Sequence, residues 1–355
     1  MWSWPRPSST RRRPSSSTPP WTASRAMPGV DAADEFETIE RLFRPLAHPQ
    51  WGRGLIDDVA ALPSRPGHDL ILTKDAMVEG VHFLPDDPMD TVARKLLRVN
   101  LSDLAAKGAE PFGYLLACFW PDASGWLERE AFAAGLAEDQ AKFGVHLLGG
   151  DTVVTPGPAS FSLTALGWIP QGRAVARAGA APGDLIVVTG MIGDGFLGLK
   201  AARGELGLED ERVAALTAHY RTPEPRVDFA LAVREYAAAA LDISDGLIAD
   251  MGHMAKASGV GILIDLEKLP LSRAATAWFE TRVDPLAALT DLATGGDDYE
   301  LLMAVAPNAI DGLKREADAR HLRLTVLGVA TEGEGVIVRY GGEIVEVAQT
   351  GWRHG

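Results

Sequence analysis

Strand-like apolar runs alternate with segments of helical apolar spacing through both halves of this sequence, and that alternation limits the possible folds more than any other feature. In the first half, the strand-like residues 69–78 and 112–120 flank residues 90–107, where apolar side chains recur at helical spacing. In the second half, the strand-like residues 184–190 lead through a glycine-rich turn into a helical segment at 196–204. Such alternation is typical of sheets covered by helices. We therefore predict an α+β fold with two layered domains.

The other segments follow the same pattern. The strand at 145–154 is predicted to be broken by a Gly-Gly-Asp turn. The further predictions are helices at 36–47 and 126–144, strands at 161–169 and 262–270, a strand tip, acidic turn and helix over 240–259, a loop feeding a strand over 293–306, and short strands over 322–347.

The domain boundary is placed by composition. A chain of 355 residues suggests two domains of ordinary size. Connectors rich in Pro, Gly and Ala lie between residues 170 and 183, so we predict an N-terminal domain at 34–172 and a C-terminal domain at 173–355.

The first 33 residues differ from the rest. Residues 1–33 are rich in Ser, Pro and Arg and lack a periodic apolar face, so we predict that they are disordered. We favour translation from Met27, with the upstream stretch a gene-start artefact, over a genuine tail. The composition also resembles an organelle transit peptide, but the prolines disfavour the amphipathic helix that such a peptide forms.

Composition narrows the functional class. Apolar residues make up 46% of the chain and charged residues 23%, the balance of a globular protein with a real core. No run of about 18 apolar residues occurs, so we expect no membrane span. The single cysteine, Cys118, excludes an intramolecular disulfide and fits a cytoplasmic location. A net charge of −14 argues against a general nucleic-acid surface.

Five short motifs each place aspartate at a predicted strand end or helix start, beside Gly, Ser or Thr that let backbone approach a ligand. They are IDDVA (Asp57, Asp58), TKDAMVEGVHF (Asp75), NLSDLAAKG (Asp103), LLGGDT (Asp151) and DISDG (Asp242, Asp245). Carboxylates without His or Cys are hard oxygen ligands that suit Mg²⁺ better than zinc. A convergent set of this kind predicts a site for nucleotide phosphates.

Each motif also has a plainer interpretation. Asp103 and Asp245 sit where a helix N-cap would sit, although five such motifs make capping alone an insufficient account. No Gly-Lys-Ser/Thr triplet is present, and the turn at 190–195 is interpreted as a structural strand-to-helix turn. Cys118 lies in an apolar run and is interpreted as a core residue. His82, taken alone, is interpreted as a core histidine.

Taken in order, the motifs MVEGVHF, NLSDLAAKGAEP, GGDT, RAVARAGAAPGDLIVVTG, DISDGL and GGDDYEL resemble the thiamine-monophosphate kinase family of the aminoimidazole ribonucleotide synthetase-like superfamily. The resemblance runs from about residue 36 to residue 352. It implies transfer of the γ-phosphoryl group of ATP to thiamine monophosphate through several Mg²⁺ ions. It also implies two α+β domains, with N-terminal domains that pair in a homodimer, a C-terminal α/β sandwich, and an active site between the domains.

The resemblance carries roles to individual residues. It implies Mg²⁺ ligands at Asp58, Thr73, Asp75, Asp103, Asp151, Asp242 and Asp245, with Asp75, Asp103 and Asp151 central to catalysis. It implies ATP contacts at Gly150, Asp151, Arg177 and Ser244. It implies contacts to thiamine monophosphate at His82, Asp297 and Trp352.

Three positions depart from the family pattern. The second glycine of the usual Gly-Ile-Gly-Asp-Asp is Ile56, the usual glutamate of Gly-Gly-Glu-Asp is Asp297, and the Thr that normally precedes the strand-end aspartate is Lys74. Strand alternation predicts that Lys74 points away from Thr73 and Asp75. Two other functions stay open: another ATP-dependent synthetase of the superfamily, and a catalytically dead nucleotide-binding module.

Overall fold

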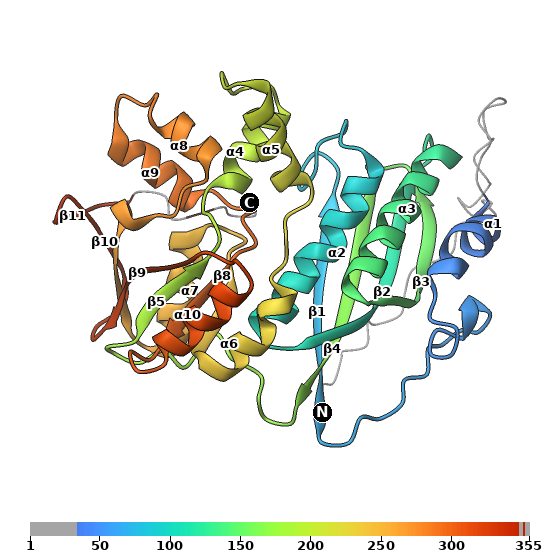
Figure 1. The fold of residues 1–355 in the computed structure, drawn as a ribbon. Coiled ribbons are helices and arrows are strands. Elements are labelled where there is room, and N and C mark those ends of the chain that lie inside the picture. The colour runs from blue at the N-terminus through green and yellow to red at the C-terminus, as the bar shows by residue number, and fades with distance from the viewer. Residues whose placement is uncertain (1–33, 348–350, 352–355) are drawn as a thin grey trace, which may run out of the picture.

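The computed structural model describes residues 34–347 and residue 351. It contains two α+β domains, which Figure 1 shows side by side with helix α2 (Met89–Ala106) between their sheets. The predicted disorder of residues 1–33 and the predicted role of Trp352 lie outside the described residues. Among the residues described, none of the helices has the length and apolarity that crossing a bilayer requires.

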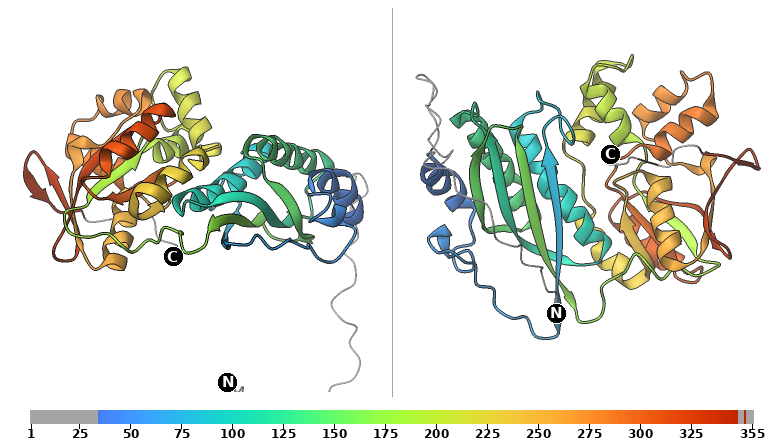
Figure 2. Two further views of the ribbon diagram at one scale, coloured as in Figure 1. Left: turned by 60° about the horizontal axis from the view of Figure 1, so that its bottom comes forward. Right: turned by 180° about the vertical axis from the view of Figure 1, so that it is seen from behind.

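The N-terminal domain is a four-stranded sheet with strand order β1-β4-β2-β3. Its strands are β1 (His68–Val78), β2 (Glu110–Pro121), β3 (His146–Thr155) and β4 (Ser160–Pro170), and a short helical segment precedes them, beginning with α1 (Glu35–Thr38). Helices α2 and α3 (Trp126–Phe143) cover one face of this sheet, as Figure 2 shows. The left-handed Gly144 ends α3, as the sequence predicted.

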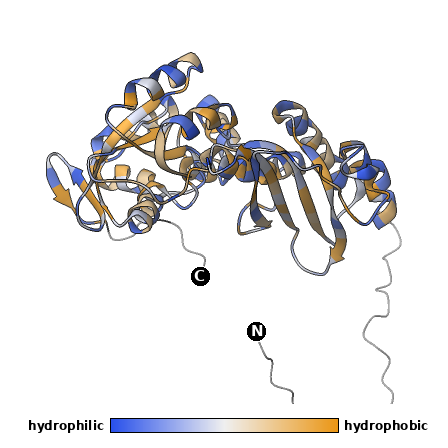
Figure 3. Ribbon diagram, turned by 90° about the horizontal axis from the view of Figure 1, so that it is seen from below, coloured by the Kyte–Doolittle hydropathy of each residue, from blue (hydrophilic) through white to orange (hydrophobic). Residues whose placement is uncertain are grey.

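The other face of this sheet carries exposed apolar side chains. We call it the open face. Along β1 the exposed and half-buried residues alternate, as expected for a strand with one covered side. Figure 3 shows apolar residues along the strands of this sheet. The exposed apolar residues of the open face are Leu70, Leu72, Leu115, Phe119 and Val153.

One sequence prediction for this sheet is wrong. Residues 146–155 form a continuous strand, and the Gly-Gly-Asp segment does not break it. The pairing with β2 instead skips Leu148 in a bulge, after which Gly149 and Gly150 lie opposite Leu115 and Leu116. A Cβ on Gly150 would lie 1.8 Å from the carbonyl oxygen of Leu116, so Gly150 allows close pairing where a turn was expected.

The C-terminal domain is a seven-stranded mixed sheet with strand order β11-β10-β7-β9-β5-β8-β6. Its strands are β5 (Leu185–Thr189), β6 (Ala237–Asp242), β7 (Gly261–Asp265), β8 (Leu301–Val305), β9 (Leu324–Thr331), β10 (Gly335–Tyr340) and β11 (Glu343–Val345). Its helices are α4 (Asp194–Ala202), α5 (Asp210–Arg221), α6 (Ala230–Tyr236), α7 (Leu247–Ser258), α8 (Arg273–Phe279), α9 (Pro285–Thr294) and α10 (Ile310–Ala319).

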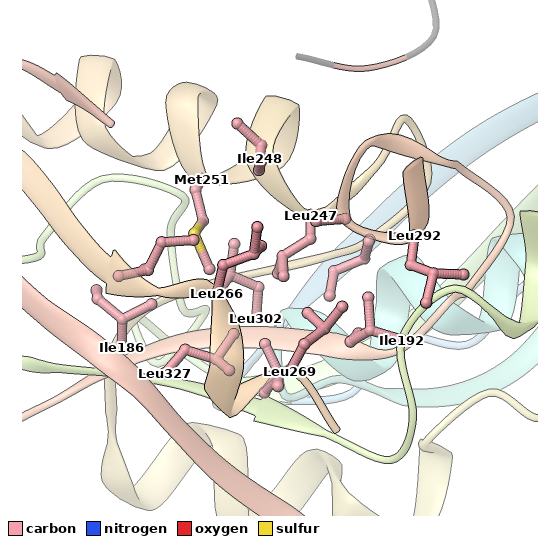
Figure 4. Packing of buried hydrophobic residues seen from close by; sticks show 14 of the residues in the cluster. Ile186, Ile192, Leu247, Ile248, Met251, Leu266, Leu269, Leu292, Leu302 and Leu327 are labelled. Atoms are coloured by element: carbon pink, nitrogen blue, oxygen red, sulfur yellow. The ribbon is translucent and has the colours of Figure 1, made fainter. Parts of the chain in front are cut away.

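Helices pack on both faces of this second sheet. Alternate residues of β5 divide between two cores: Ile186 and Val188 face the cluster built on α7, α9 and α4, and Val187 faces the cluster built on α6 and α10. Figure 4 shows the first core, where Ile186 lies among leucines and Met251. Ala105 and Ala106, at the end of α2, pack into the second core, so α2 is anchored in both domains.

Candidate active site

Four predicted ligands meet where α2 lies between the domains. Thr73 and Asp75 project from the helix-covered side of β1, Asp103 lies in the last turn of α2, and Asp242 ends β6. The Thr73 hydroxyl donates a hydrogen bond of 2.5 Å to Oδ2 of Asp103. Burial is the main cause, and the charge of nearby Asp103 the second, of two raised pKa values: that of Asp75 is raised to about 6, and that of Asp242 is raised well above its usual range. We call these four residues the α2 group.

The α2 group has the properties of a cation site. Three carboxylates repel one another at partly buried positions, and a divalent cation would offset that repulsion. All the donors are oxygen atoms, which is the ligand chemistry that Mg²⁺ prefers. The residues present therefore fit Mg²⁺.

Helix capping explains neither Asp103 nor Asp245, so the capping interpretation is wrong for both residues. Asp103 lies near the C-terminus of α2, where the helix dipole disfavours a negative charge. Gly246 occupies the N-cap position of α7 and Asp245 precedes it. The backbone N–H groups of residues 244–246 donate instead to Oδ2 of Asp250, at 3.0–3.2 Å.

A second group of predicted residues lies elsewhere on the N-terminal domain. Asp58, Gly150 and Asp151 line one pocket, together with Leu55 and Leu148. Asp58 and Asp151 are exposed. We call Asp58, Gly150 and Asp151 the β3 group.

The fold of one chain keeps the two groups apart. Asp75 lies on β1 and Asp151 on β3, which are the two edge strands of the sheet. Ladder partners place Asp151 in one row with Ala117, Ser162 and Ala76, a row on the open face, whereas Asp75 faces α2. Three strand spacings separate the edges, or roughly 14 Å. The single chain therefore does not bring all the predicted ligands together.

The C-terminal domain contributes two linked loops. The N–H of Asp297 donates to the carbonyl of Ser244 at 3.0 Å, and the N–H of Tyr299 donates to the carbonyl of Ile243 at 2.8 Å. These bonds hold the Gly-Gly-Asp-Asp loop, with Asp297, beside the loop of Ser244 and Asp245. Gly351 packs against Asp245, where an added Cβ would lie 2.7 Å from the Asp245 carbonyl oxygen.

Two lysines belong to this region, although sequence reasoning did not select them: Lys95 on α2 and Lys107, the C-cap residue that follows α2. Lys95 forms an ion pair with Asp297, with Nζ and Oδ2 2.9 Å apart, and Lys107 donates to the Ala240 carbonyl at 2.6 Å. Burial lowers the pKa of Lys107. The negative charges of Asp242 and Asp103 oppose that shift, and the positive charge of Arg177 adds to it. Arg177, an exposed predicted ATP contact, thus lies near enough to act on the same charges. Helical spacing could have indicated Lys95 from the sequence, because Lys95 and Asp103 are eight residues apart on one predicted helix and so lie on neighbouring parts of its surface.

The turn at 190–195 has a structural role, as its interpretation from sequence proposed. Both carboxylate oxygens of Asp298 accept the Gly193 N–H, at 2.9–3.0 Å, and Oδ1 also accepts the Gly195 N–H at 3.0 Å. The donors that a phosphate would need are therefore already satisfied within the chain.

Comparison with known proteins identifies the family. AIR synthase related protein, N-terminal domain, matches residues 56–169, and AIR synthase related protein, C-terminal domain, matches residues 181–341. A thiamine-monophosphate kinase of Caulobacter vibrioides is 51% identical over 331 residues, which cover 93% of this chain and 93% of that protein. The chain belongs to the thiamine-monophosphate kinase family.

Solved structures of this family support the same assignment. The thiamine-monophosphate kinase of Stenotrophomonas maltophilia is 36% identical with a TM-score of 0.76, covering 85% of this chain and 94% of that one. AaThiL complexed with AMPPCP and TMP is 31% identical with a TM-score of 0.72, covering 93% of this chain and 100% of that one. The family resemblance inferred from the motifs is confirmed.

Two of the three departures from the family pattern have a structural context. Ile56 has φ −105°, so its backbone does not require the glycine that the family usually has there. The left-handed conformations fall instead on Arg53, Gly54 and Leu55. Lys74 is exposed on the open face, whereas Thr73 and Asp75 are half-buried on the other side of β1.

The placement of Lys74 leads to a prediction. Because its side chain points away from the α2 group, Lys74→Thr should leave the Mg²⁺ concentration for half-maximal kinase activity within about twofold of wild type. A Mg²⁺ titration of initial rates measures this directly. A severalfold increase would show that the ammonium group substitutes for part of the metal charge.

Proposed function

We propose a magnesium-assisted, direct phosphoryl transfer for the thiamine-monophosphate kinase activity that family membership assigns to this chain. The acceptor oxygen belongs to the phosphate of thiamine monophosphate, which is already anionic at neutral pH, so little is required of a general base. The obstacle is repulsion between two polyanions, and charge neutralisation and alignment lower that barrier. The α2 group is the observation that carries the proposal.

Each residue has a defined role in this scheme. The α2 group, Asp58, Asp151 and Asp245 would hold several Mg²⁺ ions, which supply positive charge to the phosphate oxygens when bound. Gly150, Arg177 and Ser244 bind ATP, with the planar guanidinium of Arg177 directed at a phosphate.

Substrate binding falls to residues on both domains. His82, Asp297 and Trp352 bind thiamine monophosphate. His82 comes from the N-terminal domain and Asp297 from the C-terminal domain, so the acceptor is held between the two domains while the α2 group lies beside it.

We also propose that the protein is a homodimer whose active site uses two chains. The open face offers Leu70, Leu72, Leu115, Phe119 and Val153 to a partner, and exposed apolar patches of this kind mark interfaces. A second copy packed on this face would place its β3 edge, which carries the β3 group, beside the β1 edge of the first, which carries Thr73 and Asp75. Symmetry then forms two equivalent sites.

The shared site predicts complementation between two inactive variants. Asp75→Asn and Asp151→Asn should each remove nearly all activity, because each lacks a carboxylate of the cation site. Refolding an equal mixture should recover roughly a quarter of wild-type activity, since half the dimers are heterodimers with one intact site each. If verified heterodimers show no activity, the α2 group and the β3 group must act together within one chain.

A panel of acceptors tests the function against its alternatives. With ATP and Mg²⁺, ADP release should require thiamine monophosphate and should not respond to selenide or to formylglycinamidine ribonucleotide. A response to either of those compounds would favour a synthetase of the superfamily. ATP binding without ADP release would indicate a catalytically dead module.

A further inference from the structure

Lys95 is a buried cation that contacts both domains. It lies on α2, and its side chain is 4% exposed. Its Nζ atom donates to Oδ2 of Asp297 at 2.9 Å and to the carbonyl of His82 at 3.4 Å, and it lies 3.8 Å from the ring centroid of Tyr220. Lysine is rarely buried unless it is paired, and here a carboxylate, a carbonyl and an aromatic ring surround the ammonium group.

The loop that Lys95 contacts has a strained backbone. Asp297 and Tyr299 have φ values of +68° and +51°, which residues other than glycine seldom adopt. The Tyr299 hydroxyl donates to Oδ1 of Asp297 at 3.2 Å, so each carboxylate oxygen has one donor. This conformation persists only where its surroundings fix it. Lys95 supplies the charged contact from the opposite domain.

We propose that Lys95 is a positioning residue that determines the affinity for thiamine monophosphate. Its ammonium group fixes the Asp297 carboxylate and the backbone of the His82 loop relative to each other, so that the two proposed substrate-binding residues are held at a set separation. The inference rests on the proposed function, because it takes His82 and Asp297 as substrate contacts. Lys95 acts through these residues and does not touch the reacting phosphates.

The ion pair also determines which substrate group Asp297 accepts. An ionised carboxylate is acceptor-only and has about four lone-pair positions, of which Lys95 and Tyr299 use two. The remaining positions can receive an N–H donor, such as the exocyclic amine of the thiamine pyrimidine. The chemical class favoured here is therefore a group that donates a hydrogen bond, and an oxo group, which can only accept one, is disfavoured at that position.

Steady-state kinetics of Lys95→Met test the proposal. The KM for thiamine monophosphate should rise at least about tenfold, the loss expected when a charge-assisted contact is removed, and the KM for ATP should stay within about twofold. Lys95→Arg should restore part of the lost affinity because it keeps the charge. Lys142→Met is the matched control, since it removes an exposed lysine that pairs with Glu224 at 2.6 Å. That control should leave both constants unchanged.

Several outcomes would overturn the proposal. These are an unchanged KM for thiamine monophosphate in folded Lys95→Met, or an equal rise in both constants, which would indicate general loosening of the domains. If Lys95→Met does not fold, Lys95→Arg decides, because a KM for thiamine monophosphate identical to wild type would contradict positioning. Wild-type protein that fails to phosphorylate thiamine monophosphate would refute the proposed function itself. Active wild type with an unaffected Lys95 variant would refute this inference alone.

Discussion

Asp103→Asn is expected to lower kcat/KM by at least about a thousandfold while raising the melting temperature measured without Mg²⁺. Activity falls because the amide cannot hold a cation as a carboxylate does. Burial is the largest cause of the raised pKa of Asp75 and Asp242, and the Asp103 charge is the next. Stability rises because the variant removes this second, repulsive contribution. A mutation that disrupted packing would lower both activity and stability.

Calorimetry with and without Mg²⁺ separates these effects. Mg²⁺ should raise the melting temperature of the wild type, because it binds the folded state, and should raise that of Asp103→Asn much less. Asp122→Asn, at an exposed position of the same domain, is the control and should behave as wild type. An Asp103→Asn protein with near-normal kinase activity would remove the α2 group from the mechanism.

Of the variants considered, Arg98→Met is expected to lose the most stability, about 3–5 kcal/mol in the free energy of unfolding. Arg98 is 3% exposed and binds Asp139, which is 0% exposed, through two hydrogen bonds of 2.6 and 2.8 Å. It also donates to the carbonyls of Thr222 and Pro223 at 3.1 and 3.0 Å, joining α2 to the segment that follows α5.

The size of this loss depends on what remains beside Asp139. Arg94 lies 3.3 Å from the same carboxylate without hydrogen-bond geometry, so it offsets only part of the buried charge. The double variant Arg98→Met/Asp139→Leu should recover much of the stability, because no unpaired buried charge is left. Urea unfolding measures both variants. A loss below about 1 kcal/mol for Arg98→Met would show that the pair contributes little.

Local sequence patterns predicted single elements well. The strand expected at 69–78 is observed at 68–78, and the helix expected at 90–107 is observed at 89–106. In both elements the apolar residues recur with the period of the element, and this pattern can be read within the segment alone. The bulge at Leu148 was missed because it depends on how β3 pairs with β2, a partner distant in sequence.

The arrangement of the candidate site could be predicted only in part. The acidic motifs indicated a Mg²⁺ site, because the preference of carboxylates for this ion is a property of each side chain and does not depend on the fold. The separation of Asp75 from Asp151 follows from the strand order, which long-range pairing determines and no motif encodes. Lys95 was missed for the same reason, since its partner Asp297 lies 202 residues away.

Transfer of label from [γ-³²P]ATP tests the central claim most directly. With Mg²⁺ and thiamine monophosphate, the wild-type protein should place the label in the terminal phosphate of thiamine diphosphate, with one ADP formed for each product molecule. Omitting thiamine monophosphate or Mg²⁺ should abolish both products. Label found in inorganic phosphate, with no labelled thiamine diphosphate, would contradict direct phosphoryl transfer to thiamine monophosphate.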